Sequence, residues 1–234
     1  MAVIGRMRLG EVPRVVLSVG QDARAVASAV RQGVDILELR VDWLKPLTPV
    51  AVEKAIRGLK RYGKPLIGTI RTQAEGGRTI LTDSSRLELY RHLASCVDAI
   101  DVDLLVPQAS SIIAAAQASR NVLILSYHDF AGTPSASRLE QIVRQARGRG
   151  ADIVKIATLA KTVHDVQRLL QVTLAQRGQP LVTIAMGRVG SVSRLAFPLA
   201  GSLLTYTSLR PAHGQIPLTR LLADVRFYYP LSQQ

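Results

Sequence analysis

A single lysine interrupts an otherwise apolar stretch of the chain, a position where a charged side chain is costly. Lys155 is the central residue of the run Ile-Val-Lys-Ile-Ala, and an unpaired buried charge costs more than the roughly 2–7 kcal/mol of an unpaired neutral polar group. The lysine could form a buried ion pair, for which Glu38 or Asp103 would serve. Alternatively, desolvation favours a neutral amine that can attack a carbonyl group. We favour the second interpretation, which predicts a Schiff base on Lys155.

One histidine is the only one of four that lies at the end of a predicted strand. His128 belongs to the run Ser-Tyr-His-Asp-Phe, whereas His92 and His164 fall in predicted helices and His213 in the last loop. An imidazole at a strand end is either a partly buried group with satisfied hydrogen bonds or a general acid and base, because its ordinary pKa lies near neutral pH. We favour acid–base catalysis for His128.

Charged residues alternate with apolar ones at the end of another predicted strand. Glu38, Arg40 and Asp42 share one face of this strand, since side chains alternate with a period of two residues. They could form a layer of ion pairs. They could equally form the wall of a pocket that recognises hydroxyl groups or a carboxylate.

A glycine pair follows the end of the next predicted strand. Arg71 ends that strand, and the loop after it contains Glu75 followed by Gly76 and Gly77. Two glycines let a backbone turn tightly or approach a ligand. Glu75 is equally compatible with a solvated loop carboxylate and with a functional one.

Two further patterns could bind ions. Asp101 and Asp103 could hold Mg²⁺, but we favour a role as partners of arginine and lysine side chains, and no His or Cys spacing indicates a zinc site. Gly187 and Gly190 precede a short predicted helix and resemble a phosphate-binding loop, while Arg194 could bind any anion. This loop supports a second hypothesis, an enzyme that acts on a sugar phosphate.

The order of apolar segments indicates which elements must position these residues. Short β-rich runs alternate with helical patterns along the whole chain. The predicted strands cover residues 14–19, 34–41, 65–70, 99–102, 122–126, 153–157, 181–185 and 203–207. The predicted helices cover residues 22–32, 48–62, about 83–95, 107–119, 135–147, 163–174, a short segment from about 191, and 218–225. Asp22 and Thr48 are the expected N-caps of the first two helices.

Eight strand–helix pairs of roughly 25–30 residues each are the repeat of an α/β fold, the (β/α)₈ TIM barrel. A doubly wound open sheet gives a similar alternation. No linker or block of charge divides the chain, so we expect residues 1–234 to form a single domain. Chemistry in a (β/α)₈ barrel takes place at the carboxyl ends of the strands, which is where the polar residues described above lie.

The composition argues against several classes of protein. The chain has 234 residues, 47% of them apolar, and a formal net charge of +13, and this apolar content excludes disorder. No uncharged run supplies the ~20 apolar residues of a membrane span, and residues 1–10 lack the apolar stretch of a signal peptide. The basic residues are dispersed and aromatic residues are only 4%, which disfavours nucleic-acid binding. The lone cysteine, Cys96, excludes an intrachain disulfide and indicates a reducing cytoplasm.

Taken together, these motifs resemble those of the type I 3-dehydroquinate dehydratases. The family's motifs occur in order at residues 38–42, at Arg71 with residues 75–77, at residues 126–130 with Thr133 and Pro134, at residues 151–155, at Met186 and Gly187 with Ser193 and Arg194, and at residues 214–216. The resemblance implies a (β/α)₈ enzyme of the shikimate pathway that removes water from 3-dehydroquinate to give 3-dehydroshikimate, with no metal and no separate cofactor. It also implies a homodimer in the cytoplasm.

The resemblance further assigns roles to individual residues. Lys155 would form the imine with the substrate ketone, His128 would take the proton from the adjacent carbon and later protonate the departing hydroxyl, and Glu75 would assist the histidine. The implied substrate-contacting residues are Ser18, Glu38, Arg40, Arg71, Arg194 and Gln215, and the implied pocket wall contains Met186, Tyr206 and Ala212. Two positions depart from the family's pattern: Pro211 stands where serine is common, and Tyr206 where phenylalanine is common.

Two other functions stay open on the sequence alone. One is a Schiff-base aldolase that acts on a sugar phosphate, and the other is a non-enzymatic basic protein that binds nucleic acid. Glu38, Arg40 and Arg71 favour a polyol acid over a phosphate as the ligand. We therefore prefer the dehydratase.

Overall fold

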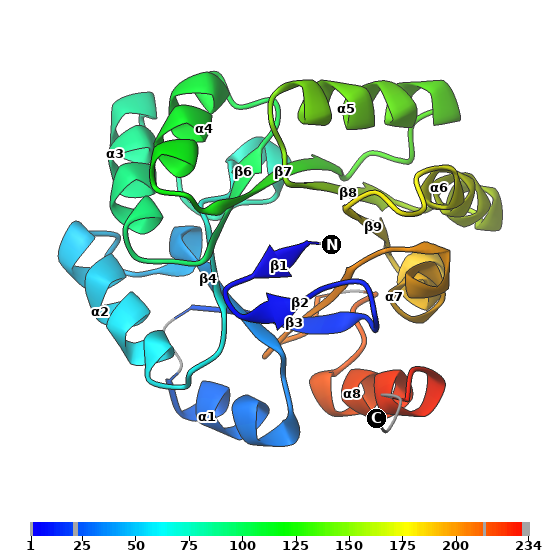
Figure 1. The fold of residues 1–234 in the computed structure, drawn as a ribbon, viewed down its shortest axis with the longest axis horizontal. Coiled ribbons are helices and arrows are strands. Elements are labelled where there is room, and N and C mark those ends of the chain that lie inside the picture. The colour runs from blue at the N-terminus through cyan, green and yellow to red at the C-terminus, as the bar shows by residue number, and fades with distance from the viewer. Residues whose placement is uncertain (1, 21–22, 213, 231–234) are drawn as a thin grey trace.

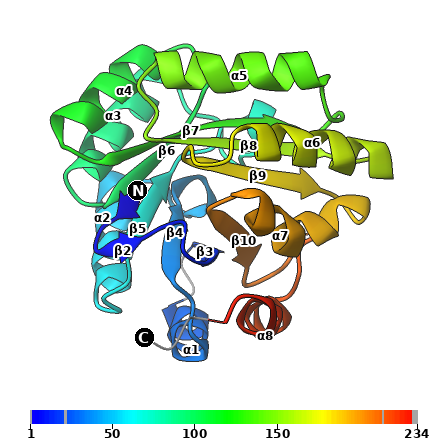
Figure 2. The same ribbon diagram turned by 45° about the vertical axis from the view of Figure 1, so that its right-hand side comes forward.

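A computed structural model describes residues 2–20, 23–212 and 214–230 of the chain. Within these ranges, eight parallel strands curve into a nearly closed barrel that is surrounded by helices (Figures 1 and 2). The strands, in their order around the barrel, are β10 (Leu204–Ser208), β3 (Arg14–Val19), β4 (Ile36–Arg40), β5 (Leu66–Thr69), β6 (Ala99–Asp103), β7 (Val122–Asp129), β8 (Ile153–Leu159) and β9 (Leu181–Met186). The predicted (β/α)₈ barrel is confirmed.

The helices lie where the sequence predicts them. They are α1 (Ala23–Gln32), α2 (Pro49–Lys60), α3 (Asp83–Ala94), α4 (Ala109–Ala118), α5 (Ala136–Gly148), α6 (Val163–Ala175), α7 (Ser193–Ala196) and α8 (Leu218–Tyr228). The short helix expected from about residue 191 is α7, a single turn flanked by the 3₁₀ segments η3 (Val189–Val192) and η4 (Phe197–Ala200). Thr48 caps α2 as expected, since its side chain accepts a hydrogen bond from the Ala51 amide. The predicted cap Asp22 lies outside the described residues.

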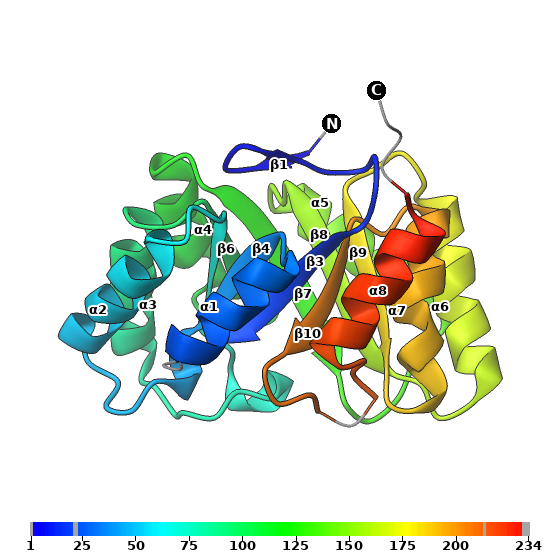
Figure 3. The ribbon, with the colours of Figure 1, turned by 90° about the horizontal axis from the view of Figure 1, so that it is seen from below.

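A short hairpin that the sequence analysis did not predict closes one end of the barrel. Strands β1 (Val3–Ile4) and β2 (Met7–Arg8) pair antiparallel, and Ile4 and Leu9 pack against Val16, at the centre of β3. Two-residue strands are too short to give a readable alternation. Figure 3 shows the hairpin at the top, where the barrel strands begin. The strands end at the bottom of that view, which is the carboxyl end of the barrel.

Two strands continue two or more residues beyond their predicted ends. Strand β7 runs to Asp129 and β8 to Leu159, three and two residues beyond the predicted limits. His128 pairs with Ala157 and Asp129 with Thr158 in the ladder between these strands. Polar side chains end the apolar pattern there, but the backbone ladder continues, and it holds His128 on a rigid strand. Among the described helices, none combines the length and the apolarity needed to cross a bilayer.

Candidate active site

A cavity of about 480 Å³ opens at the carboxyl ends of the strands. Every residue to which the family resemblance assigns a role in the site lines this cavity. These residues are Ser18, Glu38, Arg40, Arg71, Glu75, His128, Lys155, Met186, Arg194, Tyr206, Ala212 and Gln215. They come from segments spread over the whole chain, and the closed barrel brings them to one end.

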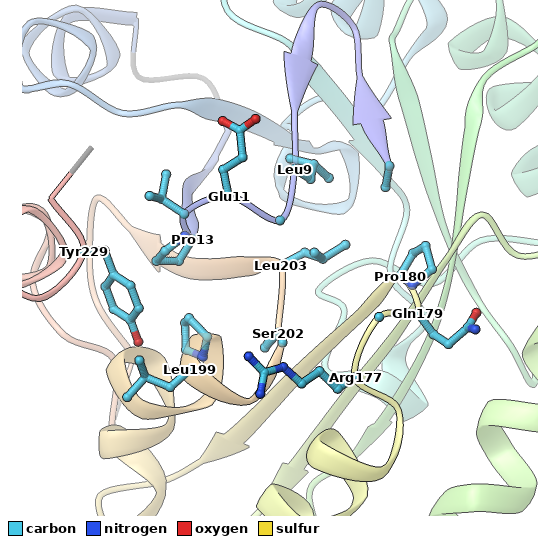
Figure 4. A pocket seen from close by; sticks show the side chains of 16 residues that line it. Leu9, Glu11, Pro13, Arg177, Gln179, Pro180, Leu199, Ser202, Leu203 and Tyr229 are labelled. Carbon is cyan, nitrogen blue, oxygen red and sulfur yellow. The ribbon is translucent and has the colours of Figure 1, made fainter. Parts of the chain in front are cut away.

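A second cavity of similar size lies at the opposite end of the barrel. Its lining includes Leu9, Pro13, Pro180, Leu203 and the two oppositely charged residues Glu11 and Arg177, as the close view in Figure 4 shows. Neither histidine nor lysine lines it. Its wall therefore lacks the amine and the imidazole that line the first cavity.

Four side chains from alternate strands form one layer inside the barrel, with Lys155 at its centre. Alternate strands supply each interior layer of a (β/α)₈ barrel, and here the members are Glu38 on β4, Asp101 on β6, Lys155 on β8 and Tyr206 on β10. The Lys155 Nζ lies 2.8 Å from Asp101 Oδ2, 3.8 Å from Glu38 Oε1 and 4.1 Å from the centre of the Tyr206 ring. The amine thus stands among two carboxylates and an aromatic ring.

The contacts of Lys155 are those of the buried ion pair that the sequence left open, and its nearest carboxylate is neither of the two expected partners. Asp101 accepts the hydrogen bond from Nζ. Of the expected partners, Glu38 lies 3.8 Å from Nζ, whereas Asp103 pairs with Arg71. The ladder register aligns Asp103 with Ser126 and Ser126 with Lys155. The strands of a barrel are tilted and staggered, so residues aligned along the ladder stand at different heights on the barrel axis. Asp101 is the residue that reaches the height of the amine.

Arg71 connects Lys155 with the histidine side of the cavity. Its guanidinium pairs with Asp101 at 2.9 Å and with Asp103, and both carboxylates are buried. Burial opposes the charge on Asp101, but Arg71 and the Lys155 amine outweigh it, so the pKa of this carboxyl lies well below its usual range. Burial also opposes the charge on Arg71, but Asp101 and Asp103 raise its pKa well above the usual value. The expected role of the two aspartates as partners of arginine and lysine is what their contacts show.

His128 and Glu75 form a hydrogen-bonded pair at the edge of this network. The His128 Nδ1 lies 2.7 Å from Glu75 Oε2, and the His128 amide donates to the same oxygen at 3.1 Å. Glu75 is buried and does not lie in a solvated loop. Burial, then the charges of Arg71 and Lys155, hold the pKa of His128 well below its ordinary value. Burial and the Asp103 charge raise the pKa of Glu75 to about 9.

The glycine pair explains how Glu75 reaches the histidine. Gly76 is left-handed, with φ of +83°, and a β-carbon there would come within 2.7 Å of the Phe130 ring. A β-carbon on Gly77 would come within 2.0 Å of the Arg71 carbonyl oxygen. The backbone contact at position 77 requires glycine, and the left-handed φ at position 76 favours it. The resulting tight turn folds Glu75 back toward His128.

The charged residues in and after β4 form both the pocket wall and the ion pair that the sequence left as alternatives. Glu38 lies in the cavity and accepts hydrogen bonds from Ser18 and, at 2.9 Å, from Thr69. Arg40 also lines the cavity and makes a two-pronged contact with Asp42 at 2.8 and 2.9 Å. Glu38 and Arg40 thus belong to the pocket wall, whereas Asp42 is not among the lining residues and serves as the ion-pair partner of Arg40.

Arg194 is a buried cation that contacts carbonyl oxygens. Its Nη1 donates to the Tyr206 carbonyl at 3.0 Å and its Nε to the Gly214 carbonyl at 3.3 Å, and no carboxylate of the described residues forms a salt bridge with it. Burial lowers the pKa of Arg194 to about 10, so the guanidinium is charged at neutral pH. A buried positive charge without an anionic partner, at the wall of a cavity, is suited to bind an anion.

The last loop closes over the same side of the cavity. Gln215 Oε1 accepts hydrogen bonds from the Ser208 hydroxyl and the Ala212 amide, both at 2.9 Å, and so folds the loop on itself. The loop also lies tightly on the β9–η3 turn, since a β-carbon on Gly214 would come within 2.3 Å of the Gly187 carbonyl oxygen. Gly187 is therefore used for contact between two loops. This packing disfavours the phosphate-binding interpretation of the glycines after β9. The neighbouring His213 lies outside the described residues.

Asp129 fixes a loop, and a separate group of Glu75, Asp103 and His128 has the spacing of metal ligands. Asp129 accepts hydrogen bonds from the Ala131 and Gly132 amides, at 2.8 and 3.1 Å, and so fixes the loop after β7. Possible ligand atoms of Glu75, Asp103 and His128 lie within 4.8 Å of one another. The Arg71 guanidinium already pairs with Asp103 and lies 3.9 Å from Glu75 Oε2, so positive charge is present at this position. These residues therefore fit a cation poorly.

The sequence analysis missed several residues of the cavity wall. Trp43, Arg78, Phe130 and Arg210 line the cavity. Trp43 lies between two guanidinium groups, with the Arg40 Cζ at 4.6 Å and the Arg78 Cζ at 4.4 Å from its ring centre. All four belong to loops after strand ends, and loops carry no periodic pattern from which the direction of a side chain could be predicted.

Comparisons with known proteins agree on one family. The family model of type I 3-dehydroquinase matches residues 12–232. The chain is 38% identical over 216 residues to the 3-dehydroquinate dehydratase of Methanocella arvoryzae, covering 92% of this chain and 96% of that protein. It resembles the crystal structure of the 3-dehydroquinate dehydratase from Aquifex aeolicus, with a TM-score of 0.85, 31% identity, and coverage of 93% and 100% of the two chains. A type I enzyme from Clostridium difficile, solved with covalently modified comenic acid, gives a TM-score of 0.89 at 25% identity, with 97% of each chain covered.

Proposed function

The chain belongs to the type I 3-dehydroquinase family of hydro-lyases, and on this premise we propose that Lys155 and His128 dehydrate 3-dehydroquinate through a Schiff base. The observation that carries the proposal is the position of both groups on the wall of one cavity at the carboxyl end of the barrel. The Lys155 amine donates a hydrogen bond to Asp101, and the His128 imidazole is hydrogen-bonded to Glu75. A nucleophile and a base in one pocket, each oriented by another group, are what covalent elimination requires.

Lys155 first releases one proton of its ion pair with Asp101 to solvent, and the resulting amine adds to the ketone of the substrate. The resulting carbinolamine loses water and leaves a protonated imine, which withdraws electrons from the adjacent carbon. His128 takes a proton from that carbon, the C–H electron pair forms a C=C bond, and the imine becomes a neutral enamine. Splitting one difficult step into several easier ones lowers the overall barrier.

Elimination then follows from the enamine. Its nitrogen lone pair expels the hydroxyl group one carbon further on, and His128 returns its proton to this hydroxyl, which leaves as water. The product is a conjugated protonated imine. Addition of one water to it releases the ketone product and the Lys155 amine, so the net change is the loss of one water from the substrate.

The charged groups around the cavity suit a polyhydroxylated acid. Arg194 is the proposed partner of the substrate carboxylate, because it is cationic, buried and without an anionic partner among the described side chains. Glu38, Ser18 and Arg40 present carboxylate, hydroxyl and guanidinium groups to the hydroxyls of the substrate. Gln215 stands on the loop that covers the bound acid. Met186 and Ala212 are the proposed apolar wall.

Reduction with borohydride tests the proposal. Protein incubated with 3-dehydroquinate and borohydride is expected to carry one covalent adduct, and peptide mass mapping is expected to place it on Lys155, because reduction fixes the imine as a stable amine. Turnover without an adduct, or an adduct on another lysine, would refute the imine on Lys155. Turnover of a sugar phosphate but not of 3-dehydroquinate would favour the aldolase.

Three further expectations from the sequence stay predictions. They are a homodimer, a single domain over residues 1–234 and a cytoplasmic location.

The pH dependence of the reaction is expected to follow the pair of Glu75 and His128. The pKa of Glu75 is raised to about 9 and that of His128 is lowered, so near pH 7 the carboxyl is protonated and the imidazole neutral. A protonated Oε2 donates to Nδ1, which leaves the hydrogen on Nε2. When the Glu75 carboxyl loses its proton, the carboxylate accepts a hydrogen bond from Nδ1–H instead. The ring hydrogen then lies on Nδ1, and the lone pair of Nε2 is free to act as the base. We therefore expect kcat/KM to rise about tenfold per pH unit up to about pH 9 and then level off.

Glu75→Gln separates this pair from other titrating groups. The amide has no proton to lose in this range, and its oxygen can accept from Nδ1–H, so Nε2 is free at neutral pH. The rising limb is expected to disappear, with a lower plateau because a neutral amide stabilises the imidazolium less than a carboxylate does. The measurement is kcat/KM for both proteins from about pH 6 to about pH 10. A rising limb that is unchanged in Glu75→Gln would assign the titration to another group.

A further inference from the structure

One hydroxyl of the cavity has no hydrogen-bond partner. Tyr206 on β10 is 5% exposed and lines the cavity, and its hydroxyl is a buried polar atom without a partner among the described residues. Leaving such a group unsatisfied in the folded protein is unfavourable. The other polar members of its layer, Glu38, Asp101 and Lys155, all have hydrogen-bond partners. The unpaired hydroxyl is therefore a feature that the protein alone does not explain.

The ring of Tyr206 fixes where this hydroxyl stands relative to the amine. The Lys155 Nζ lies over the ring, 4.1 Å from its centre. For a nitrogen above the centre of the ring face, the distance from Nζ to the phenol oxygen is about 5 Å. A tetrahedral N–C–O unit followed by one O–H···O hydrogen bond of about 2.7 Å spans the same distance. An oxygen on a carbon bonded to Nζ can therefore reach the hydroxyl.

The surroundings of Tyr206 keep the hydroxyl protonated. Burial, then the negative charges of Glu38 and Asp101, raise its pKa well above the ordinary value. Its hydrogen is therefore present at every pH at which the enzyme works, and the hydroxyl acts as a hydrogen-bond donor. Glu38 is already supplied with donors, since Ser18 and Thr69 both donate to it.

We propose that the Tyr206 hydroxyl donates a hydrogen bond to the oxygen of the ketone that Lys155 attacks, and so stabilises the tetrahedral adduct. This proposal rests on the imine chemistry proposed above. As Nζ bonds to the carbonyl carbon, the C=O π bond breaks and its electron pair moves to the oxygen, where a fixed donor has its largest effect. Tyr206 keeps its proton. The oxygen leaves as water after it gains one proton from the nitrogen and one from solvent.

Tyr206→Phe tests the role of the hydroxyl and retains the ring. The orphan hydroxyl contributes no hydrogen bond to the folded protein, so its removal is expected to leave the melting temperature unchanged or raised. The rate at which borohydride-trappable adduct accumulates on Lys155 in a single turnover is expected to fall by at least about tenfold, as for loss of one donor to a developing oxyanion. Rapid quenching with borohydride, followed by intact-protein mass measurement, gives this rate.

Thr205→Val is the matched control. Thr205 precedes Tyr206 on β10, and its hydroxyl is also buried with no hydrogen-bond partner in the described part of the chain. It does not line the cavity, as expected for adjacent residues on opposite faces of a strand. Its replacement is expected to leave the trapping rate unchanged. Equal trapping rates in Tyr206→Phe and the unaltered protein would overturn the proposal. Absence of any Lys155 adduct in the unaltered protein would instead refute the imine mechanism, so the two failures are distinguishable.

Discussion

Replacement of Lys155 by alanine is expected to abolish turnover of 3-dehydroquinate, with kcat lower by about 10⁴-fold or more. Without the amine no imine forms, and the proton next to the ketone is too weakly acidic for a neutral imidazole to remove. The borohydride adduct is expected to disappear with the activity. Formation of the conjugated product, followed by its ultraviolet absorbance, measures the rate, and intact-protein mass measurement follows the adduct.

The fold of this variant needs its own measurement, because Lys155 belongs to a buried ion pair. Asp101 keeps the Arg71 guanidinium and the Ser126 hydroxyl as partners, so the carboxylate is not left alone and the barrel is expected to fold. Lys155→Met gives a second test, since its side chain fills the space of the lysine stem without a charge. Lys161→Ala is the matched control, because Lys161 is exposed just after β8. Turnover in either Lys155 variant at near the normal rate would contradict the mechanism.

The sequence carries enough information to predict which residues meet but not how they pair. Lys155 and Glu38 are recognisable because a charged residue interrupts an apolar strand, and the alternation of strands and helices predicts that all strand ends meet at one rim. Asp101 could not be assigned to Lys155, since the pairing depends on the stagger of the barrel strands, which no local pattern records. The ladder register alone would favour Asp103.

The loop residues show a second limit of the sequence. Glu75 was equally compatible with solvent and with a functional role, and its burial depends on the tight approach of Gly77 to the Arg71 carbonyl and on the amide of His128. The first contact depends on a sharp turn of the backbone, and the second joins residues that lie far apart in the sequence, so no local pattern indicates either of them. Trp43 gave no signal, because its stacking between two arginines is a property of loop geometry.

The packing of the loop after β9 distinguishes between the sugar-phosphate enzyme and the dehydratase, which the sequence left open. A sugar-phosphate enzyme would need backbone amides free to receive a phosphate after β9. Gly187 and Gly190 instead pack closely, Gly187 against Gly214 and Gly190 against the Ala185 carbonyl. Arg194, a buried cation of this cavity without a salt bridge among the described residues, suits a single carboxylate.

Replacement of His128 by alanine is expected to separate the formation of the imine from the elimination. Lys155 and its partners Asp101 and Glu38 make no hydrogen bond to His128, so the amine is expected to capture the ketone and give a borohydride adduct. Turnover is expected to fall by about 10²–10⁴-fold, the contribution of a general acid and base. The measurements are the rate of product formation and the mass of the trapped adduct.

The mass of the adduct makes this prediction sharp, because substrate and product differ by one water. The unaltered enzyme is expected to yield adducts of both masses, since elimination occurs on the protein. His128→Ala is expected to yield the heavier, substrate-derived adduct alone, because the imine forms but the proton on the adjacent carbon is not removed. His164→Ala, at an exposed position near the start of α6, is the matched control and is expected to behave like the unaltered enzyme. A lighter, dehydrated adduct in His128→Ala at the normal rate would show that another group removes the proton, and Glu75, the nearest carboxyl group to the vacated position, would be the next candidate.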